Sequence, residues 1–165
     1  MDKLNLFNKL KGYLKLIDLG TAKILKAENG IYRTFTLLGT PHYMAPEIIS
    51  GKGYSFSVDL WSVGICLYEF VCGYLPYGED IEDPFLIYET IIKTKFTYPT
   101  FFKDKKTKAI IEQLLSIIPE LRTGGSFAAL KANQWFDNLD WVLNLIKYFS
   151  IFYIKNFRIN YMRKN

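Results

Sequence analysis

Histidine and cysteine are scarce in this sequence, which has one histidine, His42, and two cysteines among its 165 residues. Cys66 and Cys72 lie in an apolar run with no CxxC spacing and no histidine nearby, which argues against a metal site or a disulfide. We therefore interpret them as buried, reduced thiols of a cytoplasmic protein. His42 has no serine or cysteine partner motif around it, so we interpret it as a loop residue rather than a catalytic base.

Long apolar runs are also missing. The most apolar stretch, residues 58–71, is short for a bilayer and is interrupted by Asp59 and Glu69, so we expect no transmembrane segment. Residues 1–11 alternate apolar and charged side chains, a pattern that is not typical of a signal peptide.

The net charge of +5 is confined to one end of the sequence. Residues 1–146 carry sixteen basic and sixteen acidic side chains, and the five surplus bases all lie in residues 147–165. The basic balance therefore describes a tail and does not indicate a nucleic-acid-binding domain. Residues 143–165 contain no acid and no helical stripe, so we favour biased sequence without a selected role over a basic helix that touches anionic membrane weakly.

Residues 18–47 organise the sequence. An apolar strand is expected at residues 14–17, and it ends at Asp18 with Gly20 close behind. A carboxylate at a strand end beside a flexible glycine is suited to holding a cation. Hydroxyl groups beside Arg33 offer sites where an added phosphate would change the local charge.

The tripeptides DLG at residue 18 and APE at residue 45, with GTPHYMAPE between them, resemble the magnesium loop and activation segment of a eukaryotic protein kinase. The resemblance covers about residues 5–142, and RTFTLLGTPHYMAPEII with DLGTAKIL is most similar to the cGMP-dependent kinases. It implies a mainly α fold: the C-terminal large lobe of the protein kinase-like fold with a short β-hairpin, the small lobe being absent. The implied parts are residues 1–17 (a remnant of the catalytic loop and a strand pair), 18–47 (the activation segment), 48–142 (the helical lobe) and 143–165 (a divergent basic tail).

The resemblance also implies a nucleotide site that uses ATP and Mg²⁺. Asp18 resembles the magnesium ligand, and Asn5 falls on the family's second metal ligand, although a chance asparagine in a surface turn is an equal alternative. The family's catalytic Asp would fall one position before Met1. Thr40 resembles the hydroxyl that steadies that Asp in Ser/Thr kinases.

Within the activation segment, Thr36 resembles the phosphorylated threonine and Thr34 is its nearest rival. Lys23 resembles a base that binds the added phosphate. The residues expected to receive the protein substrate, including its basic side chains, are Leu37, Leu38, Gly39, Pro41 and Glu69.

The rest of the sequence is read as helices. Residues 55–72 predict a helix capped by Ser55 or Ser57 and ended by Gly73, apolar on every side and therefore buried. Further helices are expected after Phe85 and over residues 109–117. By resemblance, Asp59 holds the catalytic loop, and Arg122 pairs with Glu47.

The function implied is transfer of the ATP γ-phosphate to protein Ser or Thr, by a chain that we expect to be inactive alone. The alternative is a pseudokinase-like docking fragment, or a truncated gene product.

Overall fold

The computed structural model describes residues 18–141, so Asn5, the strand expected at residues 14–17 and the basic tail lie outside the described residues. The chain divides into two units, residues 1–131 and 132–165, which we treat separately. Nearly all regular structure in the described part is helical, with one two-stranded antiparallel hairpin. The mainly α fold class with a short β-hairpin is therefore confirmed.

The longest helix, α2, runs over Ser57–Cys72. It ends as expected at Gly73, whose φ of 87° is left-handed and whose N–H donates to the Glu69 carbonyl at 2.8 Å. The expected serine cap is wrong, because the N-cap residue is Phe56 and no side chain caps this end. The glycine is the more dependable marker because its conformation is one that other residues rarely adopt.

The faces of α2 differ in burial. Trp61, Ile65 and Tyr68 are completely buried, whereas Val63 is 53% exposed and Phe70 is 72% exposed. The expectation that α2 is buried on every side is therefore wrong. Val63 and Phe70 are seven residues apart and so share one face of the helix.

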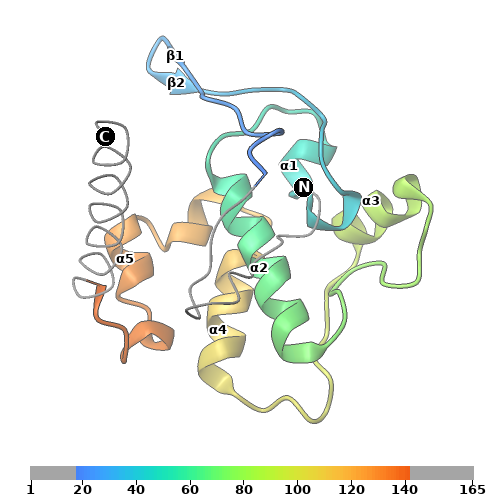
Figure 1. Cartoon of the computed structure of the whole chain (residues 1–165), viewed down its shortest axis with the longest axis vertical. Coiled ribbons are helices and arrows are strands. Elements are labelled where there is room, and N and C mark those ends of the chain that lie inside the picture. The colour runs from blue at the N-terminus through green and yellow to red at the C-terminus, as the bar shows by residue number, and fades with distance from the viewer. Residues whose placement is uncertain (1–17, 142–165) are drawn as a thin grey trace, which may run out of the picture. The chain divides into compact units, whose positions relative to one another are not determined.

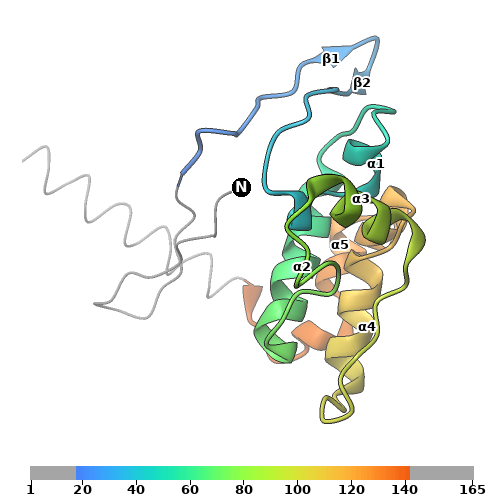
Figure 2. The same ribbon diagram turned by 90° about the vertical axis from the view of Figure 1, so that its right-hand side faces the viewer.

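The core of the first unit forms around α2. Helix α4 (Lys105–Leu114) lies alongside α2 in both views (Figures 1 and 2). Tyr68 packs against the rings of Phe96 and Tyr98 and donates its hydroxyl to the Thr97 carbonyl at 2.6 Å. The core cluster consists of Ala45, Trp61, Ile65, Tyr68, Cys72, Tyr77, Ile87, Ile91, Ile111 and Leu115.

Helices α3 and α4 begin at aspartate caps. Asp83 accepts from the Phe85 amide at the start of α3 (Pro84–Lys93), and Asp104 accepts from two amides at the start of α4. Helix α4 therefore starts four residues before the expected residue 109. In α3 the buried side chains are Ile87 and Ile91, whereas Phe85 is 79% exposed.

Shorter helical turns complete the first unit. They are η1 (Pro41–Tyr43), α1 (Pro46–Ile49), η2 (Pro119–Thr123) and α5 (Phe127–Lys131). Both views show α1 and α3 side by side (Figures 1 and 2). The segment that leads to α1 thus ends among helices.

The hairpin pairs β1 (Ala27–Glu28) with β2 (Ile31–Tyr32). Asn29 and Gly30 make the turn with φ angles of 52° and 79°, as two-residue hairpin turns require. The strand pair expected from the sequence lies before residue 18, outside the described residues. No hairpin was predicted at residues 27–32, although Asn-Gly is a strong hairpin pattern. Both views show the hairpin away from the helices (Figures 1 and 2).

The second unit is described only up to Trp141. It contains η3 (Gln134–Phe136), and the Phe136 ring lies 4.8 Å from Trp135 and 5.0 Å from Trp141 between centroids. Across residues 18–141 of both units, no helix has the length and apolar content of a membrane span.

A close approach of α2 to the end of α4 generates a test of this packing. A Cβ at Gly64 would lie 2.8 Å from Leu115 Cδ2 and 2.9 Å from Leu114 Cβ. Overpacking costs about 1–3 kcal/mol and opposes the gain in helix propensity of about 1 kcal/mol. We expect Gly64→Ala to lower the free energy of unfolding in urea, and to cost less in a Leu115→Ala background. An increase in stability would contradict this packing.

Candidate functional site

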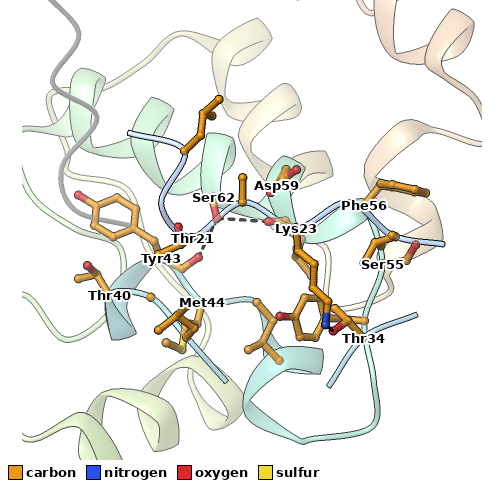
Figure 3. A pocket seen from close by; sticks show the side chains of 18 of the residues that line it. Thr21, Lys23, Thr34, Thr40, Tyr43, Met44, Ser55, Phe56, Asp59 and Ser62 are labelled. Carbon is orange, nitrogen blue, oxygen red and sulfur yellow. Dashed lines mark hydrogen bonds between the residues drawn. The ribbon is translucent and has the colours of Figure 1, made fainter. Parts of the chain in front are cut away.

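A hollow of about 280 Å³ lies beneath the activation segment. Its walls come from Thr34 and from within residues 18–25, 38–48 and 54–62, the last of which include the start of α2. Figure 3 shows Thr40, Tyr43 and Met44 on one side and Lys23, Thr34 and Phe56 on the other. Asp18, Thr40 and Asp59, three residues singled out by the sequence, all line this hollow.

Asp18 adopts a φ of 59°, and its Oδ1 accepts the Gly20 amide at 3.1 Å. Aspartate tolerates this left-handed conformation better than most residues. The carboxylate is exposed at the hollow, as a metal ligand must be to reach a nucleotide. Residues 18–141 hold no group of three or more acidic, histidine or cysteine ligands. Mg²⁺ is commonly held by one or two carboxylates together with substrate phosphates, so Asp18 fits as a single ligand.

Asp59 and Thr40 approach the hollow from different elements. Asp59 stands in the first turn of α2, and partial burial raises the pKa of its carboxyl. Thr40 is the N-cap residue of η1, and its carbonyl accepts the Tyr43 amide at 3.1 Å. The hollow thus has a second acidic residue besides Asp18, and Thr40 is one of several hydroxyl-bearing residues in its walls.

Lys23 lies between the two candidate phosphorylation sites. Its Nζ donates to Thr34 Oγ1 at 2.8 Å and to Thr36 Oγ1 at 3.5 Å, and Figure 3 shows the side chain reaching toward Thr34. Thr34 is buried, whereas Thr36 is exposed. A modifying enzyme can therefore reach the Thr36 hydroxyl more easily, and a phosphate there would meet the ammonium group of Lys23.

The segment ends at a buried ion pair. The Arg122 guanidinium donates to both oxygens of Glu47, at 2.6 and 2.8 Å, and its side chain is fully buried. It also donates to the carbonyls of Ser57 and Ser116 at 3.1 and 2.9 Å, and lies 5.1 Å from the Trp61 ring. These contacts satisfy a charge that would be costly to bury alone.

Of the residues expected to receive a substrate, Leu38 and Gly39 line the hollow, whereas Leu37 and Pro41 do not. Leu37 and Leu38 are each 57% exposed, and Pro41 begins η1. Gly39 has a φ of 127°, which lets the backbone turn toward η1. Glu69 does not line the hollow.

Glu69 instead accepts the Tyr43 hydroxyl at 2.8 Å. Burial and this carboxylate together raise the pKa of Tyr43 far above its usual value. His42 was interpreted as a loop residue but lies within the helical turn η1, where its Nε2 bonds to the Gly78 carbonyl at 3.0 Å.

Tyr54 was missed by the sequence analysis. Its hydroxyl donates to the Thr36 carbonyl at 2.6 Å, and it lines the hollow. The two residues lie 18 positions apart, and no motif indicates their contact. Tyr43 was missed as a partner of Glu69 for the same reason.

A helical lobe, a segment that crosses a hollow and a buried Glu–Arg pair at its end define the class as the large lobe of a kinase-like fold. The comparisons agree, because the model of the protein kinase domain matches residues 3–136. The chain belongs to the protein kinase family.

Its relatives are much longer than the chain itself. It is 44% identical over 140 residues to the cGMP-dependent protein kinase of Plasmodium berghei (strain Anka), and 42% identical to that of Toxoplasma gondii. It is 39% identical to the cAMP-dependent protein kinase catalytic subunit of Dictyostelium discoideum. These alignments cover 83% of this chain but only 16%, 14% and 20% of the respective relatives.

The buried ion pair predicts an asymmetric response to mutation. Glu47→Ala leaves the Arg122 charge buried without its partner, so we expect a loss of about 3–5 kcal/mol in the free energy of unfolding. As a control, Glu89→Ala breaks the exposed pair with Lys93 on α3 and should cost at most about 1 kcal/mol. Urea denaturation measures both losses, and equal losses would contradict the structural role of Glu47.

Proposed function

We propose that the chain carries the peptide-docking and magnesium-contacting half of a serine/threonine kinase of the cyclic-nucleotide-dependent type, which transfers the γ-phosphate of ATP to protein Ser or Thr. The observation that carries the proposal is that Asp18 and Thr40 line the same hollow. The names of the relatives support the cyclic-nucleotide-dependent type. Because the chain aligns with only 14–20% of the length of these relatives, the proposal concerns this part of a kinase.

Asp18 would hold Mg²⁺, which in protein kinases neutralises charge on the ATP phosphates. Thr40 would steady a catalytic carboxylate, and its hydroxyl-bearing side chain supports Ser/Thr specificity. Asp59 would hold the backbone of the catalytic loop from its place in the first turn of α2.

Thr36 would be the regulatory phosphorylation site. Phosphorylation adds a charge of about −1.5 to −2 at neutral pH. The ammonium group of Lys23, 3.5 Å from the Thr36 hydroxyl, would then pair with the phosphate. Thr34 is the poorer site because its hydroxyl is buried.

Docking without catalysis is the second candidate. The exposure of Leu37 and Leu38 favours it, because exposed apolar side chains can receive a peptide without a nucleotide. Both candidates share a protein substrate or ligand with basic side chains, which Glu69 would receive. We also propose a cytoplasmic location, since Cys66 and Cys72 are free thiols.

Peptide binding tests the docking role. We expect a labelled peptide with two arginines before its serine to bind the chain in fluorescence anisotropy. Glu69→Gln should weaken binding at least about tenfold, since hydrogen bonds between charged groups contribute about 1.5–3 kcal/mol. Glu112→Gln, at an exposed position of α4, is the matched control. The proposal fails if Glu69→Gln weakens the binding of a control peptide, with glutamines in place of the arginines, to the same extent.

Nucleotide binding separates catalysis from docking. Residues 18–141 hold no group of three or more metal ligands around Asp18, and positioning supplies most of the catalysis in phosphoryl transfer. We therefore expect Mg²⁺-ATP to leave the Tm of the isolated chain unchanged in scanning calorimetry. A rise of several degrees that Asp18→Asn abolishes would show instead that this chain binds the nucleotide by itself.

A further inference from the structure

The loop between α1 and α2 pairs with the activation segment through a backbone bridge. Thr34 and Tyr54 form an isolated antiparallel bridge in which each amide donates to the other residue's carbonyl, at 3.0 and 2.9 Å. Reciprocal bonds of this kind fix the register of two extended segments. The bridge therefore sets which residues of the segment face the loop.

The Tyr54 side chain adds a third bond two residues further on. Its hydroxyl donates to the Thr36 carbonyl at 2.6 Å. The contact fixes the backbone of Thr36, while the hydroxyl of Thr36 stays on the side of Lys23. One tyrosine thus holds both ends of the tripeptide from Thr34 to Thr36.

Gly53 allows the loop to come this close. Its φ is 82°, and a Cβ there would lie 2.5 Å from Arg33 Cδ and 2.7 Å from Phe35 Cε1. Successive side chains of an extended segment point to opposite faces. Arg33 and Phe35 accordingly cover Gly53, whereas Thr34 and Thr36 face Lys23.

Little else holds this part of the segment. Among the described residues, hydrogen bonds from the rest of the molecule to residues 33–38 come from Lys23 and Tyr54 alone. Phe35, Leu37 and Leu38 are all largely exposed. The position of the Thr36 backbone therefore depends on the loop.

We propose that Gly53 and Tyr54 form a clasp that positions residues 33–38, and that Tyr54 is a positioning residue for Thr36 and the substrate loop behind it. That the clasped segment regulates and receives substrates rests on the function proposed above. The clasp itself rests on the contacts alone. It closes without a phosphate on Thr36, so it orders the segment before any modification.

Limited trypsin digestion of the full chain, followed by mass spectrometry, tests the clasp. Cleavage between Arg33 and Thr34 requires the bridge to open, so its rate follows the open population. Tyr54→Phe removes one hydrogen bond and should speed this cleavage roughly two- to tenfold. Cleavage after Lys95, in another exposed loop, should stay unchanged, which separates local release from general destabilisation.

Two matched controls sharpen the result. Gly53→Ala should speed cleavage after Arg33 more than Gly51→Ala, because Gly51 has a similar φ of 66° but open space around it. Tyr32→Phe removes a hydroxyl of the hairpin for which the described residues show no hydrogen bond, and it should leave cleavage unchanged.

The proposal is overturned if Tyr54→Phe leaves cleavage after Arg33 at the wild-type rate, or if both glycine variants accelerate it equally. The peptide titration above reports separately on the proposed function. The proposed function can fail in that titration while the cleavage rates still support the clasp.

Discussion

The buried guanidinium of Arg122 is the constraint on which the rest of the structure depends. A buried charge has to be paired and hydrogen-bonded, and the partners of Arg122 are spread along the chain. Glu47 closes the activation segment, Ser57 begins α2, and Ser116 follows α4. With Trp61 against its face, the arginine joins three parts of the sequence at one point. Movement of the end of the segment would therefore leave the buried charge of Arg122 without its partner Glu47.

The middle of the same segment is held in a different way. Lys23 and Tyr54 contact it through exposed or half-buried side chains. A neutral bond such as that of Tyr54 contributes only about 0.5–1.5 kcal/mol, and a bond from a charged group about 1.5–3 kcal/mol. Segments held by few buried contacts open locally far below the global free energy of unfolding. The molecule thus combines a rigid end at Glu47 with a middle, around Thr36, that remains accessible to a modifying enzyme.

A structural feature could be predicted from the sequence where it is caused by neighbouring residues or belongs to a recognisable motif. The end of α2 at Gly73 was predicted because glycine readily adopts the left-handed conformation that ends a helix. The pairing of Glu47 with Arg122 was predicted from the resemblance to the protein kinase family. The exposure of Val63 and Phe70 on one face of α2 was not predicted. Composition shows that a helix is apolar but does not show which of its faces packs against a partner. The start of α4 was placed too late, because its first turn, KKTK, has no apolar periodicity. The contact of Tyr54 with Thr36 has no sequence pattern at all.

Three residues of the hollow that the sequence singled out are held to different degrees. Thr40 and Asp59 stand at the starts of η1 and α2, two elements tied to the core, so their side chains are already positioned. Asp18 is exposed, and its one hydrogen bond to another described residue is the bond that it accepts from Gly20. Electrostatic catalysis depends on groups that are positioned before the reaction. Thr40 and Asp59 therefore stand on packed elements, whereas Asp18 does not, and a bound metal ion with its phosphates would supply the further contacts that fix the Asp18 carboxylate.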